Sequence, residues 1–434
     1  MNISEILEQK QNGLSLSKEE ISFIILSYYQ GKLNEAKMLD FLRLIDENNF
    51  SYEETFFLAD ALAKTGRRLD IKKDVGFVID KHSAGEFSDA STLIFMSVLA
   101  SLGVKNVKSL SDVYGSFNNS LDRLRLFDGF DARISRDRLV QIINKTNAGV
   151  IEEDDFALVD KKLYILAKKF NINSIPFTAA SILAKKIATG ASALVFDVKT
   201  GEGAMFQSEI YAETLAKYLV EGAKLAGFLV SSVISNLDQP LGSSVGLRVE
   251  VEEALSVIRC EKSLYASKLL DVSKELVINA LILSDPTILR PDAARLFDDA
   301  INSGTALNKF REIISEYGGE FVDFKHTPEK LLDGIHVSYL SANKSGYVND
   351  IVISRVFNAY MNLAFRNGKL KDENAGIVLM VGEGDKISEG DKIARIFYHI
   401  DNKNFSESVT MLKKAFRISQ SKPQQRKILY KVII

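Results

Sequence analysis

The residues best suited to chemistry lie in a polar segment between two apolar ones. This segment runs from Asp80 to Thr92, after the apolar run Val75 to Ile79 and before the apolar stretch Leu93 to Leu102. Loops between a strand and a helix offer backbone N–H groups and a helix N-terminus to an anion, and Lys81 adds a full positive charge. The pattern therefore predicts a phosphate site. An ordinary polar loop that caps the next helix has the same pattern, so both interpretations stay open.

A second pair of polar residues is brought together by helical spacing. The run Ser174-Ile175-Pro176 leads into a segment of helical character, in which Ser181 and Lys185 are four positions apart. Side chains at i and i+4 share one face of a helix, so a hydroxyl and an ammonium would converge there. Such a pair could hold a polar heterocycle. A solvated helix face is the alternative interpretation of the same spacing.

Composition limits the classes of function. The chain has 434 residues, of which 46% are hydrophobic and 26% charged, and its net charge is −2. These values are typical of a compact protein of two domains, and they give no positive field that would favour nucleic acid or a membrane. The four histidines lack zinc-ligand spacing, so no metal is expected, and one cysteine, Cys260, suits a reducing compartment. Without a leader or an apolar spanning segment, we expect a cytoplasmic protein.

The periodicity of apolar residues predicts an α/β fold with two additions. Residues 1–65 have helical periodicity and two capping boxes, at Ser17–Glu20 and Ser51–Glu54. Downstream, short apolar runs alternate with turns and helical patterns, as expected for strands and helices around a sheet. The segment 160–190 is again helical and lacks strand character. Beyond about residue 330, short β-prone runs with Gly-Asp turns indicate a β-rich subdomain.

Several segments, in their order along the chain, resemble motifs of the thymidine and pyrimidine-nucleoside phosphorylase family. The resemblance covers nearly the whole chain, and because so many motifs occur together it is specific. The matching segments are Asp80-Lys81-His82-Ser83, Asp160-Lys161-Lys162-Leu163-Tyr164, Ser174-Ile175-Pro176, Ala180-Ser181-Ile182-Leu183-Ala184-Lys185-Lys186, Asp197-Val198-Lys199-Thr200-Gly201, Gln239-Pro240-Leu241-Gly242 and the region Gly376 to Ile396.

The resemblance implies a fold and an assembly. A small all-helical domain, residues 1–65 and 160–190, would face a larger α/β domain, residues 70–155 and 191–330, across a cleft. A β-rich C-terminal subdomain, residues 331–434, would follow. Closure of the two domains would join the two substrates, and the protein would form a homodimer.

The resemblance also implies a reaction, in which inorganic phosphate attacks C1′ of a nucleoside and releases a pentose 1-phosphate and a free base. As the glycosidic bond breaks, negative charge develops on the base, so donors aimed at the base oxygens stabilise the leaving group. By correspondence with the family motifs these donors are His82, Ser181 and Lys185. His82 is in addition the candidate general acid at a base oxygen.

The remaining matched residues correspond to phosphate ligands. By the same correspondence, Lys81, Ser83 and Thr92 would hold phosphate next to C1′, which positions the nucleophile. A nucleoside and phosphate are therefore the expected ligands. Phosphate acts as the co-substrate, and no further cofactor is implied.

The two phosphate loops depart from the family pattern. After His-Ser the family continues with T-G-G-x-G-D, whereas this chain has residues 84–89, with a glutamate at position 86. Glycine lets the backbone approach an anion, and a carboxylate close to phosphate repels it. The family's second loop, S-G-R-G-x-G-H-T-G-G-T, corresponds to residues 110–120, where Leu110 replaces the serine and only Gly115 is left of the glycines. Both departures weaken the expected phosphate site.

The base side departs from the family at one position. After Asp-Lys-Lys-Leu-Tyr the family has an arginine that grips the pyrimidine carbonyl, and this chain has Ala167. Lys168 is the candidate base-binding replacement. It would act as a point charge, without the bidentate fork of arginine.

Two functions from different classes follow from these features. The first is a divergent pyrimidine-nucleoside phosphorylase, a pentosyltransferase that is weak or inactive. The second is a non-catalytic homologue that binds a nucleoside or another ligand, or that acts as a regulatory or structural partner. A third interpretation, an anthranilate phosphoribosyltransferase-like enzyme that handles pyrophosphate with magnesium, is disfavoured by the 180–186 helix and the β-rich C-terminal third.

Overall fold

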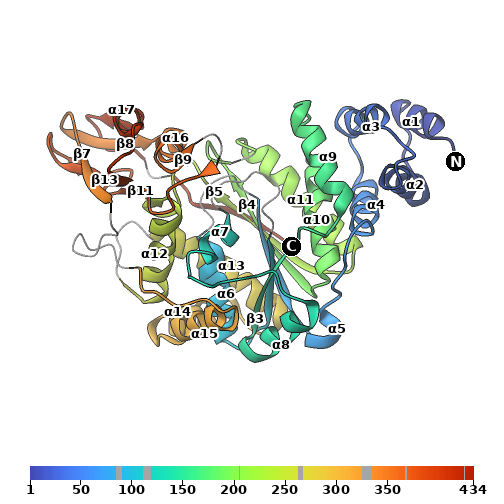
Figure 1. Ribbon diagram of the computed structural model, residues 1–434, viewed down its shortest axis with the longest axis horizontal. Helices are drawn as coiled ribbons and strands as arrows, with labels where there is room; N and C mark the ends of the chain where they lie inside the picture. The colour runs from blue at the N-terminus through green and yellow to red at the C-terminus, as the bar shows by residue number, and fades with distance from the viewer. Residues whose placement is uncertain are drawn as a thin grey trace.

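A computed structural model shows the arrangement of the chain. It describes residues 1–84, 90–110, 119–204, 206–261, 267–324, 334–366, 369–424 and 426–434. Figure 1 shows a helical region at the N-terminal end, a sheet flanked by helices in the middle, and a β-rich region at the opposite end. The predicted fold class is thus confirmed in its three parts.

The N-terminal helices begin where the sequence predicts. Both predicted capping boxes are present: Ser17 accepts from the backbone of Glu20 and Ser51 from that of Glu54, and both glutamates bond back to the cap. These contacts satisfy N–H groups that a helix end leaves unpaired. The helices are α1 (Ile3–Gln11), α2 (Lys18–Tyr29), α3 (Glu35–Glu47) and α4 (Tyr52–Ala63), and they are joined by α9 (Leu158–Lys169) and α10 (Ile175–Thr189).

The middle of the molecule is a sheet whose strands are almost all parallel. In the part of the chain that the structure describes, its order is β15-β5-β4-β1-β2-β3. β1 to β5 run parallel and β15 runs antiparallel at the edge. The strands are β1 (Ile79–Ala84), β2 (Asn106–Leu110), β3 (Ala148–Glu152), β4 (Ala193–Thr200), β5 (Leu229–Asn236) and β15 (Leu429–Ile433).

Helices cover both faces of this sheet. One hydrophobic core joins the N-terminal helices to α10, α11 and one face, and a second core lies between the other face and α6, α12, α13, α14 and α15. The helices of this part are α5 (Lys72–Val75), α6 (Ser91–Ser101), α7 (Ser120–Leu124), α8 (Arg136–Thr146), α11 (Glu209–Leu225), α12 (Leu247–Ile258), α13 (Ser267–Ser284), α14 (Arg290–Asn302) and α15 (Thr305–Glu316).

One strand boundary differs from the prediction. The sequence predicts a strand at Val75 to Ile79 and a loop from Asp80 to Thr92, but Val75 ends α5 and β1 extends from Ile79 to Ala84. The prediction was wrong because Asp80 and Lys81 are polar, and polar residues are rare in buried strands. Both side chains are nevertheless buried, and each has a partner from another element. A charge can be buried when it is paired.

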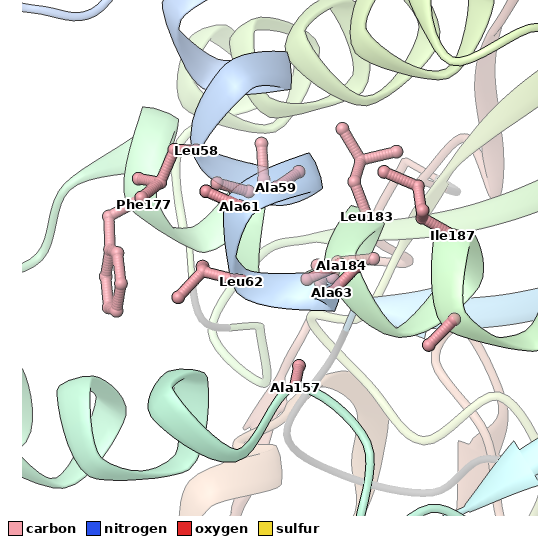
Figure 2. Close-up of a cluster of buried hydrophobic side chains, with 14 of the residues drawn as sticks. Leu58, Ala59, Ala61, Leu62, Ala63, Ala157, Phe177, Leu183, Ala184 and Ile187 are labelled. Carbon is pink, nitrogen blue, oxygen red and sulfur yellow. The ribbon is translucent and has the colours of Figure 1, made fainter. Parts of the chain in front are cut away.

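α10 links the helical region to the sheet. Figure 2 shows alanines of α4, including Ala59 and Ala63, beside Leu183, Ala184 and Ile187 of α10. Small side chains let two helices approach closely, which fixes their mutual position. The core of the helical region is therefore continuous with the core on one face of the sheet. The expected cleft between the domains stays a prediction, because the loop residues 85–89 and 111–118 lie outside the described part.

In its described residues, the C-terminal region contains two helices and several short antiparallel sheets. Their orders, among the described residues, are β6-β11-β13-β7, β12-β8-β14 and β10-β9. The elements are β6 (Ser244–Val245), β7 (Ile335–Ser341), β8 (Gly346–Ile351), α16 (Ile353–Ala364), β9 (Phe365–Arg366), β10 (Lys369–Leu370), β11 (Gly376–Leu379), β12 (Lys386–Ile387), β13 (Lys392–His399), α17 (Phe405–Lys413) and β14 (Phe416–Ser419).

Two strands cross between the expected domains. β6 comes from the segment assigned to the α/β domain but pairs with β11 of the C-terminal region. β15 comes from the segment 331–434 but pairs with β5 at the edge of the central sheet. These two strand pairings therefore cross the expected domain boundary at residue 330. The C-terminal tail is part of the central sheet.

Candidate functional site

Strand β1 presents polar side chains to both faces of the sheet. Successive side chains of a strand point to opposite faces, so Asp80 and His82 share one face and Lys81 and Ser83 share the other. Asp80 contacts α10 through Lys186, whereas Lys81 contacts the start of α6. Four consecutive residues of β1 thus place polar side chains on both faces of the sheet. They lie close to the carboxyl end of the strand, where open α/β sheets bind ligands.

On the α6 side, three hydroxyl groups surround the ammonium of Lys81. Its Nζ lies 2.6 Å from Ser83 Oγ, 3.0 Å from Ser91 Oγ and 2.9 Å from Thr92 Oγ1. The ammonium donates in each case, and each hydroxyl oxygen accepts. Lys81, Ser91 and Thr92 are buried and Ser83 is half-buried. The structure thus brings the three predicted phosphate ligands together and adds Ser91.

The carboxylate of Asp197 on β4 connects this cluster to its neighbours. Its Oδ2 accepts from Ser83 Oγ at 3.2 Å and lies 3.8 Å from Lys81 Nζ. Its Oδ1 accepts from Lys199 Nζ at 2.7 Å and from Ser235 Oγ at 3.2 Å. The register explains these contacts, because Ser83 is opposite Asp197 and Lys199 is opposite Ser235 in adjacent parallel strands. We call Lys81, Ser83, Ser91, Thr92, Asp197, Lys199 and Ser235 the sheet-side cluster.

On the α10 side, a buried ion pair joins β1 to the helix. Lys186 Nζ donates to Asp80 Oδ2 at 2.9 Å and to Ser109 Oγ of β2 at 3.0 Å. Burial raises the pKa of the Asp80 carboxyl, while Lys186 and then Lys108 act against that rise. Lys108, a further buried lysine, donates to the carbonyl of Lys81 at 2.6 Å. The ends of β1 and β2 are therefore rich in buried lysines.

A second carboxylate joins the predicted base-side residues. Asp160 of α9 accepts a 2.9 Å hydrogen bond from Ser181 Oγ, and the same oxygen lies 3.6 Å from Lys185 Nζ. All three side chains are buried. Ser181 and Lys185 lie one turn apart on α10, which is the geometry that their spacing predicts. We call Asp160, Ser181 and Lys185 the helix-side cluster.

His82 is the third predicted base-side residue, and it lies on the α10 face of the sheet by the alternation along β1. It is half-buried and pairs in register with Phe196 of β4. Ser109, which contacts Lys186, belongs to the next strand in the sheet. The convergence of His82 with Ser181 and Lys185 on one ligand stays a prediction. It requires His82 to lie on the face of the sheet that α10 covers, and His82 does so.

The remaining predicted residues are Lys168 and those of the two loops that depart from the family pattern. The side chain of Lys168 is exposed in the last turn of α9, whereas Ala167 beside it is buried. Leu110, which takes the place of a family serine, is buried at the end of β2. The predicted anion loops at 85–89 and 111–118, Glu86 and Gly115 included, lie outside the described residues.

Several residues in and beside these clusters have no role in the prediction from sequence. Asp197 and Lys199 belong to a matched motif without an assigned function, and Ser91, Asp80 and Lys186 are likewise unassigned. A signal was available for Asp197 and Lys199, since two opposite charges sit two positions apart inside the apolar run of β4. Charged residues in a fully buried strand require partners. Asp80 and Lys186 are 106 positions apart, and nothing local indicates their pairing.

Chemically, the two clusters differ in what they offer a ligand. The sheet-side cluster presents hydroxyls backed by an ammonium, a combination suited to the oxygens of an anion. The helix-side cluster presents one hydroxyl and one ammonium held by one carboxylate, which suits a neutral polar group. Within the described residues, no group of histidine, cysteine and acidic side chains is arranged to hold a metal ion. Among those residues no helix is both long and apolar enough to cross a membrane.

Comparison with known proteins fits this fold and this residue set. Residues 76–307 match the model of the glycosyl transferase family, a/b domain. The chain is 31% identical over 440 residues to a pyrimidine-nucleoside phosphorylase of Staphylococcus epidermidis, with 100% of both chains covered. It is 32% identical over 402 residues to one of Geobacillus stearothermophilus, with 92% of each covered. The chain therefore belongs to this glycosyltransferase family and is homologous over its whole length to the pyrimidine-nucleoside phosphorylases.

A solved structure supports the fold. Anthranilate phosphoribosyltransferase from Thermus thermophilus superposes with a TM-score of 0.58 at 15% sequence identity. The match covers 72% of this chain and 99% of that one. At this identity the likeness concerns the fold alone. The predicted family resemblance is confirmed by the full-length relatives, and the α/β fold by this structure.

Proposed function

We propose that the chain is a pentosyltransferase of the pyrimidine-nucleoside phosphorylase type. The observation that supports the proposal is that the residues expected on each side of the site lie in hydrogen-bonded, largely buried clusters. In the proposed site, Lys81 with Ser83 and Thr92 would bind the anion, and Ser181 with Lys185 would bind the base; within each group the side chains are connected through the contacts described above. Burial of so many polar groups is costly, so a chain that had lost all need for a ligand would have little reason to keep both.

In the proposed reaction, an oxygen of inorganic phosphate forms a bond to C1′ of the nucleoside while the C1′–N bond breaks. The electron pair of that bond passes to the base, which gains a proton, so the products are a pentose 1-phosphate and a free base. Lys185 and Ser181 stabilise the negative charge on the base, and His82 supplies the proton at a base oxygen. The sheet-side cluster fixes the phosphate next to C1′. Phosphate is the co-substrate and no other cofactor takes part.

Release of free base tests this proposal directly. Purified protein is incubated with thymidine and with uridine, with and without phosphate, and free thymine or uracil is measured by chromatography. We expect base release that requires phosphate. Absence of release at high protein concentration, with either nucleoside, would refute the enzymatic function.

The second candidate is a non-catalytic homologue that binds a nucleoside or another ligand, or that serves as a partner subunit. The observation that favours it is Leu110, an apolar, buried side chain at a position where the family pattern has a serine. Calorimetric titration with thymidine and uridine distinguishes the two. Nucleoside binding that is independent of phosphate, without base release, supports the non-catalytic function.

We propose further that the protein forms a homodimer, as the family resemblance implies. Sedimentation equilibrium measures the assembly directly. A species of twice the chain mass of 48.3 kDa is expected. A monomer at concentrations well above those used in the assays contradicts the proposal.

A further inference from the structure

The Asp80–Lys186 ion pair stands apart from both clusters and yet adjoins each of them in sequence. Asp80 directly precedes Lys81 and lies two residues before His82 on the same strand. Lys186 directly follows Lys185 on α10. The pair therefore connects the strand that carries the expected phosphate ligand and general acid to the helix that carries the base-side donors.

The environment of the pair is closed. Asp80 is fully buried and Lys186 is 1% exposed, and their contact distance is 2.9 Å. Lys186 also donates to Ser109, so α10 is tied to two neighbouring strands. Among the described residues, Asp80 Oδ1 has no hydrogen-bond partner, whereas Oδ2 accepts from Lys186; Lys108 adds a second positive charge nearby. Removing either partner would leave the other buried charge without its direct ion-pair partner.

Stability alone does not account for such a pair. Replacing a buried ion pair with apolar groups of similar volume is often neutral or even stabilising, because the desolvation of two charges offsets most of their attraction. An ion pair restricts the relative orientation of the two elements that it joins, because it favours one contact geometry between them. Apolar packing tolerates several arrangements of similar energy.

We propose that Asp80 and Lys186 are positioning residues. Their ion pair sets the place of Ser181 and Lys185 on α10 relative to His82 and Lys81 on β1. Neither residue touches the ligand. The inference rests on the proposed function for its kinetic consequence, but its geometric content concerns the fold and can be tested without turnover.

The decisive variant replaces both charges at once. The double variant Asp80→Asn/Lys186→Met removes both members of the ion pair together, so the chain is expected to fold, with a midpoint of thermal unfolding close to that of the wild type. We expect kcat/KM for the nucleoside to fall by at least about tenfold, because displacement of catalytic groups by about 1 Å can cost up to about a hundredfold. KM for phosphate should change by less than about twofold, since no member of the sheet-side cluster lies on α10.

A matched control is available inside the helical region. Lys10 and Glu54 form another buried ion pair, also at 2.9 Å, which joins α1 to α4 and contacts neither cluster. The variant Lys10→Met/Glu54→Gln changes the same kinds of residue at the same burial. We expect its kcat/KM to stay within about twofold of the wild type, even where its thermal stability falls further.

A second readout does not depend on activity. With ¹⁵N-labelled histidine, the imidazole signal of His82 can be assigned with a His82→Gln variant. We expect its position to shift in Asp80→Asn/Lys186→Met. The signals of His336 on β7 and His399 on β13 should not move, and in Lys10→Met/Glu54→Gln none of the three should move.

The outcomes separate the two proposals. Without base release by the wild type, a shifted His82 signal still supports the positioning role, while the enzymatic function fails. With base release, a folded Asp80→Asn/Lys186→Met protein that keeps both its His82 signal and its kcat/KM overturns the positioning role and leaves the enzymatic function intact. An equal kinetic loss in the Lys10→Met/Glu54→Gln control also overturns it.

Discussion

The sheet-side and helix-side clusters use the same three functional groups in different proportions. Their described members contain two ammonium groups around one carboxylate on the sheet side, at Lys81, Lys199 and Asp197, and one ammonium beside one carboxylate on the helix side. The first arrangement is built from strands and the start of a helix, and the second from two helices. The comparison shows that the cluster with the excess of positive charge is built mainly on strands of the central sheet, whereas the cluster with balanced charge is built on two helices.

The largest expected effect comes from removing the ammonium at the centre of the sheet-side cluster. Lys81→Met removes three charge-assisted hydrogen bonds, each worth about 1.5 to 3 kcal/mol. We expect kcat/KM for phosphate to fall by at least about a thousandfold, which corresponds to ~4 kcal/mol. Initial rates at varied phosphate concentration measure it.

Lys199→Met is the matched control for that variant. Lys199 is equally buried and binds the same carboxylate, but on the other oxygen and away from the three hydroxyls. Lys199→Met should lower the free energy of unfolding about as much as Lys81→Met does. Its kcat/KM for phosphate should fall by less than about tenfold. If the two variants lose phosphate turnover equally, the cluster acts only through its charge balance, and the role of the hydroxyls is contradicted.

An intermediate effect is expected from Asp160→Asn on the helix side. An amide keeps an acceptor for Ser181 but loses the charge that holds Lys185, so both donors become less well oriented. We expect nucleoside affinity to fall by about 10- to 100-fold, or ~1.4 to 3 kcal/mol, with phosphate affinity unchanged. Calorimetric titration with each ligand separately gives both values. A parallel loss of phosphate affinity would show that the clusters are not independent.

The sequence predicted the helical region, the alternating α/β part and half of the members of the two clusters. It did so because capping boxes, helical spacing and family motifs are local signals. The boundary of β1 was missed, since Asp80 and Lys81 look like loop residues until their distant partners are known. The Asp80–Lys186 contact joins two elements that no local pattern connects. Sequence therefore identified side chains more reliably than the contacts that orient them.

A smaller effect, on stability and not on either cluster, is expected from Glu252 of α12. Burial raises the pKa of its carboxyl to about 7, although Arg259, 2.7 Å away, acts against the rise; Asp323 and Glu261 add to it. Because the folded pKa lies above the unfolded one, the folded state binds the proton more tightly. Stability from this group is present at pH 4.5 and is lost as the pH rises to 7.

We expect the free energy of unfolding to fall by roughly 1 to 2 kcal/mol between about pH 5 and pH 7, after allowance for solvent screening. Urea denaturation at several pH values measures the slope. Glu252→Gln carries no titrating proton, so it should remove this part of the slope and leave ligand affinities unchanged. An unchanged slope in Glu252→Gln assigns the pH dependence to other carboxyls.

The smallest effect is expected from Lys168→Ala, which tests the outer limit of the helix-side cluster. Lys168 extends from the last turn of α9 into solvent, while Ser181, Lys185 and Asp160 are buried. An exposed ammonium is well hydrated and screened, and its interactions are commonly worth less than about 1 kcal/mol. We therefore expect nucleoside affinity within about fivefold of the wild type, measured by calorimetry at low and at physiological salt. A larger loss that disappears at high salt would mean that Lys168 acts as the point charge in place of the family arginine, and that the helix-side cluster carries a net positive charge when a nucleoside is bound.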